Sequence, residues 1–554
     1  MRKLVVSGHT KSRPYKVAPT VVGARSLLSR INELSPPSDQ CVPSCPPMKR
    51  NDAAQNAKRT AGWSSKMLND PTTTKTNRYG VLVGASTWDD RLPSYGSANM
   101  QLSRAVALVP RSGFTMRDAQ AHELSGATTE GARYFNSAVR AFTLIYGDAI
   151  GLYDAAVKAC PEFVMAYLGK AWPLVLANDP VMAISARALL NAARELRMND
   201  RERAHLSALV HAAIGHRASA VKILDRHLMS YPFDLVAHMA ALQMDGHLGR
   251  FHWARDRSAR ALPLWSKAQE SYGIMQSFYS FGLEEAGDYA RAEDTARAAA
   301  ELEPFGYWPH HCVSHVMEMM GRPKDGLAWM EVREPFWSSK DNLNRVHIWW
   351  HKSLFHIELG QYEAALQIYD GPILATMRPA SMSICNGAAL LWRLDALGCA
   401  LGDRWQHLAE RWEGHANGRL YVFPDIHAAM SELRAGHVPQ FERRLKAMRE
   451  TAANGTELGA IYRDIGLPVV EGLSAFHHGA YARTVEHLLP ARFDLWKMGG
   501  SKAQRDIIDW TLLEAAVRAG QRDIALSLAH ERLAMRPKSA PNQHFLQAAI
   551  TIAA

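Results

Sequence analysis

The feature that most constrains this chain is a turn glycine that recurs about every three dozen residues. Five such glycines are separated by steps of 34, 38, 34 and 39 residues: Gly215, Gly249, Gly287, Gly321 and Gly360. In four units a small residue follows the glycine by five positions: Ala220, Ala292, Ala365 and Ala525. In three units a proline follows the glycine by seventeen positions: Pro232, Pro304 and Pro537. Glycine permits a tight turn between two helices, a small residue lets the helices approach closely, and proline ends the second helix.

A period near 34 residues is that of the tetratricopeptide unit, a pair of antiparallel helices. One pair cannot bury its apolar face alone, so successive pairs must stack. Stacking also accommodates 554 residues, which exceed the usual limit of one compact core. The sequence therefore predicts an all-α, right-handed superhelix (α-solenoid) of tetratricopeptide-like helix-turn-helix repeats.

We expect four regions along the chain. We expect residues 1–110 to be a basic, largely disordered leader, because they are rich in Ser, Pro and Thr without a helical or strand period. Alternatively, the assigned start of the chain lies upstream of the true one. Residues 111–372 and 461–554 carry the repeat anchors. Residues 373–460 are an irregular helical segment in which glycines break the period, and they are a candidate cap over the groove of the superhelix.

The positive charge belongs to the leader. Residues 1–110 contain sixteen Lys and Arg against six Asp and Glu, so the remaining residues contain forty-eight of each sign. A nucleic-acid-binding domain usually carries a basic stripe on its folded surface, and we therefore expect no nucleic-acid partner. No apolar run is long enough for a membrane span. Six scattered cysteines indicate a reducing compartment, so a cytoplasmic location is expected.

Four motifs resemble those of one known family. They are WPHHCVSHVMEMMGR at 308–322, HIWWH at 347–351, DIHAAM at 425–430 and GGSKAQRD at 499–506. They resemble the tetratricopeptide repeat protein 38 family, and the resemblance covers about residues 115–540 and leaves out the leader. It implies a helical-repeat fold in a soluble protein. It implies no particular reaction, because no settled activity is attached to that family.

Histidines are concentrated between residues 310 and 356, which hold six of the 24 in the chain. His311 and His315 are four apart, so their rings share one helix face, and Glu318 follows one turn later. His347 and His351 repeat this spacing on the first helix of the next unit. In the repeat proteins that this chain resembles, first-helix positions 2, 5, 6 and 9 line the concave groove. The two pairs fall at positions 5 and 9 and at 2 and 6, so we expect four imidazoles to face one groove.

Three interpretations of this cluster stay open. In the first, the imidazoles donate hydrogen bonds to a metal-free ligand, with Trp349 or Trp350 as an apolar wall. In the second, His311, His315, His347 and His351 bind a divalent metal, with Glu318 as a further ligand or base. In the third, the histidines only satisfy polar partners between packed helices. No resident cofactor is expected outside the metal interpretation.

Other polar clusters are weaker candidates. Glu284 and Glu285 end a first helix and are interpreted as a solvated helix end, with a coupled acid pair as the alternative. Asp425 could cap a helix or orient His427, and both are retained as ligand-binding candidates. The stretch 499–506 reads as a capped helix start, with anion binding as the alternative.

Two function hypotheses follow. The chain is either a binding module whose concave groove takes a peptide, a protein partner or a small ligand through the His and Trp cluster, or an enzyme. The enzyme would be a metal-dependent hydrolase type that uses His311, His315, Glu318, His347 and His351. No Gly-x-Ser-x-Gly, Walker, dinucleotide or His-Glu-x-x-His motif is present.

Overall fold

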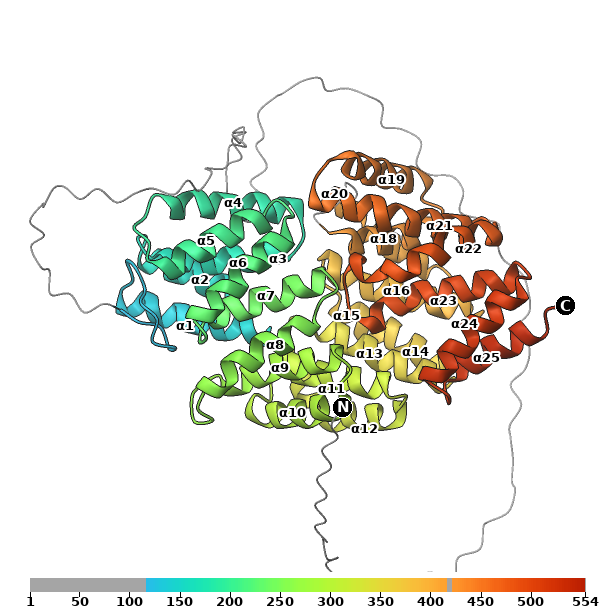
Figure 1. Cartoon of the computed structure of the whole chain (residues 1–554), viewed down its shortest axis with the longest axis horizontal. Coiled ribbons are helices and arrows are strands. Elements are labelled where there is room, and N and C mark those ends of the chain that lie inside the picture. Colours follow the sequence, from blue (N-terminus) through green and yellow to red (C-terminus); the bar gives the residue numbers. More distant parts are fainter. Residues whose placement is uncertain (1–115, 416–420, 554) are drawn as a thin grey trace, which may run out of the picture. The chain divides into compact units, whose positions relative to one another are not determined.

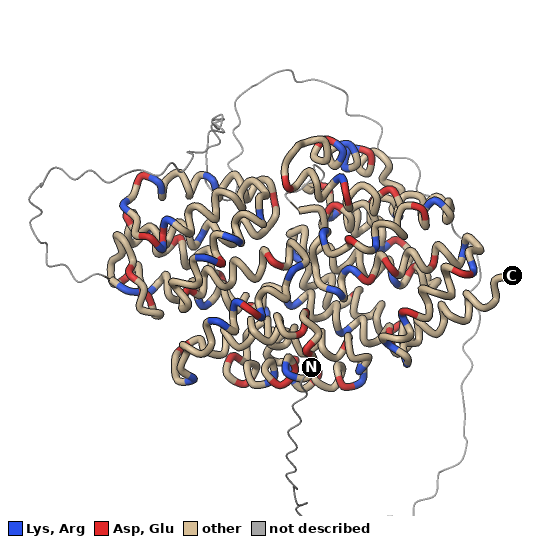
Figure 2. The backbone as a smooth tube through the Cα atoms, in the orientation of Figure 1, with Lys and Arg blue, Asp and Glu red and all other residues tan. Residues whose placement is uncertain are grey.

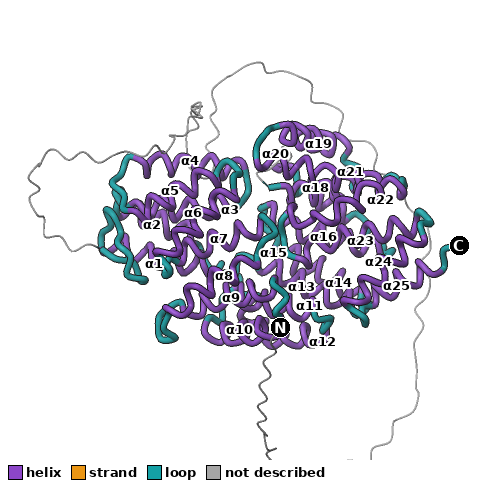
Figure 3. The backbone as a smooth tube through the Cα atoms, viewed as in Figure 1, coloured by secondary structure: helices purple, strands orange, loops and turns teal. Residues whose placement is uncertain are grey.

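The computed structural model describes residues 116–415 and 421–553, all of which belong to one compact unit, residues 107–554. The predicted leader, residues 1–110, lies outside the described residues. Within them the chain consists of helices and connecting loops, with two isolated bridges, Arg117 to Glu123 and Tyr146 to Asn342, and no longer strand (Figure 3). The prediction of an all-α fold is confirmed.

Successive helices pair with their neighbours along the chain (Figure 1). The first part comprises α1 (Thr129–Leu144), α2 (Ala149–Ala159), α3 (Val164–Leu176), α4 (Pro180–Arg194), α5 (Asp200–Ala212), α6 (Arg217–Ser230), α7 (Leu235–His247), α8 (His252–Ala261), η1 (Leu262–Leu264), α9 (Tyr272–Glu285), α10 (Tyr289–Leu302), α11 (Tyr307–Met319) and α12 (Pro323–Trp337). The second comprises α13 (Arg345–Glu358), α14 (Tyr362–Ile368), η2 (Tyr369–Ile373), α15 (Leu374–Thr376), α16 (Ser381–Ala396), α17 (Arg404–Glu410), η3 (Glu413–His415), α18 (Val422–Arg434), α19 (Val438–Ala453), α20 (Glu457–Ile461), η4 (Tyr462–Gly466), α21 (Leu467–His477), α22 (Tyr481–Ala491), η5 (Arg492–Met498), α23 (Lys502–Arg518), α24 (Arg522–Met535) and α25 (Ala540–Ile550).

The repeat anchors do what their chemistry predicts. Gly287 joins α9 to α10 with φ of 86°, and Gly321 joins α11 to α12 with φ of 63°. Such left-handed values disfavour residues that carry a Cβ, so the short turn requires glycine. Ala292 of α10 is completely buried, as a close approach of the paired helices demands. The glycine period therefore marks real helix-turn-helix units.

The anchor prolines have a second role that involves a side chain six residues later. His238 Nε2 lies 3.1 Å from the carbonyl oxygen of Pro232, and His310 Nε2 lies 2.7 Å from that of Pro304. Each imidazole donates a hydrogen bond to the carbonyl oxygen of the proline that follows the end of the preceding helix. His310 is thus a structural residue and is separate in role from its neighbour His311.

Contacts also join repeats that are far apart in the sequence. Gly147 N donates to Asp341 O at 2.8 Å, and Gly500 N donates to Gly246 O at 2.9 Å. Helix α23 contacts α11, although almost two hundred residues separate them. Long-range packing of this kind buries side chains that a simple stack of neighbouring pairs would leave exposed.

Charged residues of both signs are interspersed over the described helices (Figure 2). No helix within residues 116–415 and 421–553 has the length and apolarity that a membrane span requires. The segment 373–460 contains helices α15 to α19 and the start of α20. Its role as a cap stays a prediction.

Candidate functional site

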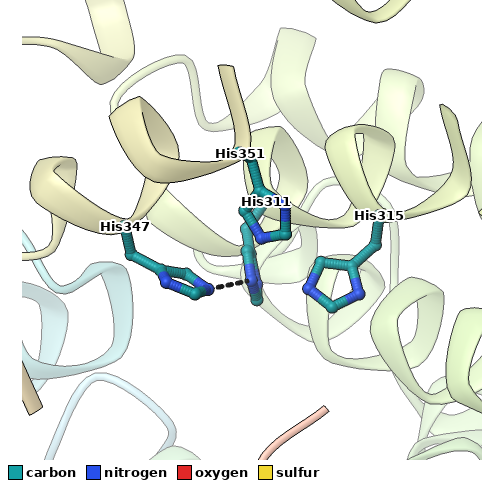
Figure 4. Close-up of side chains that lie close together, drawn as sticks. All are labelled: His311, His315, His347 and His351. Atoms are coloured by element: carbon teal, nitrogen blue, oxygen red, sulfur yellow. Dashed lines mark hydrogen bonds between the residues drawn. The ribbon is translucent and has the colours of Figure 1, made fainter. Parts of the chain in front are cut away.

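Helices α11 and α13 lie against each other and bring four imidazoles together. His311 and His315 lie one turn apart on α11, and His347 and His351 lie one turn apart on α13. Figure 4 shows the four rings turned toward a common centre. Ring centroids of neighbouring pairs are 4.4 to 5.2 Å apart. One nitrogen from each ring lies within 4.8 Å of the others. The four rings therefore converge as predicted, but the expectation that they face an open groove is not met, because all four are buried.

The cluster is buried among aromatic side chains. The exposed fractions of His311, His315, His347 and His351 are 4%, 0%, 6% and 0%. Tyr307 and Phe281 stack on the ring of His311, with centroids 4.7 and 4.9 Å away. Trp350 stacks on His347, with ring centroids 5.1 Å apart, and its role as the wall of a ligand site stays a prediction. The aromatic packing fixes the rings and excludes water from them.

His347 is held in one tautomer by Asn386 of α16. Its Nδ1 lies 2.6 Å from Asn386 Oδ1. The amide nitrogen of Asn386 already donates to the carbonyls of Met382 and Ser383, so its oxygen must be the atom that faces the ring. Nδ1 therefore carries the proton, and Nε2 presents a lone pair to the cluster. Burial lowers the pKa of His347 to about 4, although the bond to Asn386 partly opposes this.

His351 is oriented in the same way by a carboxylate. Its Nδ1 lies 3.1 Å from Glu318 Oε2, and its Nε2 makes no hydrogen bond with any described residue. Burial raises the pKa of Glu318 to about 7, and the Arg536 guanidinium, 4.0 Å from Oε1, partly opposes this. A histidine whose outer nitrogen donates to a carboxylate is the usual arrangement around protein-bound metals.

His315 faces a second carboxylate. Its Nδ1 lies 3.5 Å from Glu284 Oε2 of α9, which is an ion-pair distance, and neither ring nitrogen makes a hydrogen bond within the described chain. Burial alone would lower the pKa of His315, but the carboxylates of Glu284, Glu285 and Glu318 together raise it. Three of the four rings thus have a side-chain oxygen at Nδ1.

The fourth ring, His311, contacts His347 directly. Their Nε2 atoms are 3.1 Å apart (dashed line in Figure 4). Burial, together with the neighbouring His315, holds the pKa of His311 well below its usual range. Burial has the same effect on His351. His311, His347 and His351 are therefore neutral at pH 7, which is the form that binds metals.

The interpretation of Glu284 and Glu285 as a solvated helix end is wrong. Their exposed fractions are 0% and 7%. The physical reason is tertiary: α9 packs against α8, α10 and α11, and Arg505 and Lys502 of α23 are among the charges that act on Glu285. Burial and the adjacent Glu284 raise the pKa of Glu285.

The structure does not bring Asp425 and His427 together. Asp425 accepts hydrogen bonds from Arg444 at 2.6 Å and from Tyr462 at 2.5 Å. His427 donates from Nδ1 to the carbonyl of Phe423, 2.9 Å away on its own helix. The helix begins after Tyr421, so Asp425 lies within its first turn and does not cap it. Their role in ligand binding stays a prediction.

The stretch 499–506 is the capped helix start that the sequence predicts. Ser501 is the N-cap of α23, and its side chain accepts from Gln504 N while Gln504 reaches back to Ser501 N. This reciprocal pair satisfies two backbone donors without a bound anion.

A second cluster, which sequence reasoning missed, resembles the first only in composition. His205, His227 and Asp234 lie together and are buried. Here Arg201 Nε donates to Asp234 Oδ2 at 2.6 Å, and Trp172 Nε1 donates to His205 Nδ1 at 2.9 Å. His205 Nε2 must then donate to Asp234. Because the carboxylate is neutralised by arginine, this cluster is a closed structural network.

Sequence reasoning also missed Asn386 as a partner of His347. It lies 39 residues away on α16. No sequence spacing could have signalled this contact, because it depends on how two repeats pack.

No protein-family model matches the chain. Solved structures of the human IFIT1 dimer with PPP-AAAA and with m7Gppp-AAAA align over 77% of this chain and 96% of theirs, at 13% and 12% identity and TM-scores of 0.35 and 0.34. A monomeric IFIT1 mutant with Gppp-AAAA aligns over the same shares at 12% identity and a TM-score of 0.34. At this level of similarity no ligand or site residue is transferred. The helix pairs and their turn glycines themselves give this chain a tetratricopeptide-like helical-repeat fold.

Proposed function

We propose that this helical-repeat protein binds a divalent transition-metal ion of the zinc, copper or iron class through His311, His315, His347 and His351. The observation that carries the proposal is the orientation of the rings. Side-chain oxygens of Asn386, Glu318 and Glu284 lie at the Nδ1 atoms of three rings, which leaves their Nε2 atoms for the ion. Imidazole nitrogen suits these metals, whereas magnesium and calcium prefer oxygen.

The spacing of the nitrogens is compatible with such an ion. Four ligands of tetrahedral zinc, each about 2.0–2.1 Å from the metal, lie about 3.3 Å from one another. The two Nε2 atoms of His311 and His347 are 3.1 Å apart, and all four rings have a nitrogen within 4.8 Å of the others. To close the set around one ion, side-chain rotations must shorten the longest of these separations by up to about 1.5 Å.

A purely structural network accounts for less of the geometry. In that case His311 Nε2 donates to His347 Nε2, which explains one contact. It leaves His351 Nε2 and His315 Nε2 buried without a hydrogen-bond partner among the described residues. Buried polar atoms in native proteins are nearly always satisfied. A peptide ligand is also disfavoured, because at most 6% of any of the four histidines is exposed.

We also infer membership of the tetratricopeptide repeat protein 38 family. The four motifs quoted above support it, and two of them supply all four imidazoles. The ligand that we propose for this protein is the metal ion bound by these imidazoles.

Metal analysis of the purified protein tests this function. After exposure to zinc, copper or iron and removal of excess, we expect retained metal that a chelator extracts slowly. His351→Gln should lose it, and Asn386→Leu should weaken binding about 10–100-fold, as removal of outer partners does elsewhere. His205→Gln in the closed network is the matched control and should keep wild-type affinity. Circular dichroism verifies that each variant is folded. A folded wild-type protein that retains none of these metals would overturn the proposal, as would unchanged affinity in His351→Gln.

A further inference from the structure

The proposed metal centre has a carboxylate neighbour on one side. Glu284 and Glu285, at the end of α9, and His315 of α11 each offer one ligand atom, and these three atoms lie within 4.8 Å of one another. All three side chains are at least nine-tenths buried. Two adjacent carboxylates in such a place need a compensating cation or a proton, because burial of an unpaired charge is strongly unfavourable.

The described arginines and lysines form no ion pair with either carboxylate, and the basic group at ion-pair distance is the imidazole of His315, whose Nδ1 lies 3.5 Å from Glu284 Oε2. Neither carboxylate oxygen of Glu284 makes a hydrogen bond in residues 116–415 and 421–553, and Glu285 Oε1 makes none either. Arg505, whose charge acts on both glutamates, donates its hydrogen bonds to the backbone carbonyls of Gly499 and Gly500. The Asp234 cluster shows the contrast, since its carboxylate is paired directly with Arg201 at 2.6 Å.

His315 connects this carboxylate pair with the four-histidine centre. Figure 4 shows one nitrogen of His315 turned toward the other three rings and the other turned away from them. Nδ1 is the nitrogen that lies 3.5 Å from Glu284 Oε2, so Nε2 faces the centre. A single buried imidazole thus lies between two groups of metal-ligating atoms.

From this juxtaposition we infer that a second divalent ion binds to Glu284, Glu285 and Nδ1 of His315, so that the ring of His315 bridges two metal ions. The inference rests on the proposed function, because the first ion occupies Nε2 of the same ring. An imidazole that binds metal through both nitrogens has lost both protons, so uptake of the second ion releases the last ring proton to solvent. The oxygen-rich donor set suits zinc, manganese or iron at this second position.

Metal stoichiometry separates this inference from the proposed function. Titration of metal-free protein with zinc should give two equivalents per chain for the wild type and one for Glu284→Gln/Glu285→Gln. A control pair on the exposed face of α19, Glu442→Gln/Glu450→Gln, should still bind two. One equivalent in the wild type and in both double variants would overturn the second site and leave the proposed function standing. No bound zinc in any of them would overturn both.

A spectroscopic measurement on the wild type alone covers the case in which the acidic double variant does not fold. Two copper(II) ions joined by one imidazolate couple magnetically, and their separate paramagnetic signals are lost. We expect copper-loaded wild-type protein to show a coupled spectrum at two equivalents. Two uncoupled copper signals at full loading would rule out the bridge through His315.

Discussion

Gly282 of α9 lies where the backbone of α8 approaches so closely that one added atom would clash. A Cβ built on Gly282 would lie 2.1 Å from Arg255 N, 2.6 Å from Arg255 Cα and 2.7 Å from Ala254 C. Ordinary contacts begin near 3.4 Å, so in Gly282→Ala the two backbones must separate by about 1 Å. Overpacking of this kind costs about 3 kcal/mol, and the better helix propensity of alanine returns about 1 kcal/mol. The free energy of unfolding should fall by about 2 kcal/mol.

Urea unfolding followed by circular dichroism measures that loss. Gly371→Ala is the control, because a Cβ at Gly371 meets nothing within 4 Å, and it should be neutral or slightly stabilising. Gly282 also precedes Glu284 by two residues on α9, so its displacement should weaken the second zinc equivalent before the first. Unchanged stability of Gly282→Ala, or an equal loss in Gly371→Ala, would refute the reasoning about helix contact.

Three further predictions concern other buried contacts between the described helices. Burial would raise the pKa of Asp506, but the bidentate contact with Arg532 lowers it. The ionised carboxylate therefore stabilises the folded state fully at pH values above its unfolded pKa of about 4. This stabilisation is lost as the pH falls through the lower folded pKa. Asp506→Asn should therefore cost about 3 kcal/mol at pH 7 and only somewhat less at pH 3, where the folded carboxyl is still ionised although the unfolded one is mostly protonated, as measured by urea unfolding at both pH values. Ala292→Leu should destabilise the completely buried contact between α9 and α10 by about 1–3 kcal/mol in the same assay. His310→Ala removes the bond to the Pro304 carbonyl and should cost about 1 kcal/mol without changing metal content; a loss of metal would contradict its structural role.

The sequence alone predicted the local features of the fold, which are the turns, the helix contacts and the helix faces. The turn glycines at 287 and 321 have left-handed backbone angles, and Ala292 is buried, as their spacing predicts. The i, i+4 spacing of His311 and His315 placed both rings on one helix face, and the repeat period placed the second pair opposite them. These features depend on contacts within one repeat or between neighbouring repeats, which a sequence period can encode.

Tertiary structure alone decided the environment of that cluster. Glu284 and Glu285 end a helix and read as solvent-exposed, yet packing of the distant α23 on α11 accompanies their burial beside His315. Asn386 selects the tautomer of His347 across two repeats, and no local pattern indicates it. Turn chemistry and helical periodicity are short-range and survive in the sequence as spacing. Burial and ring orientation arise from contacts between residues that the chain keeps far apart, so they emerge only when the repeats are packed.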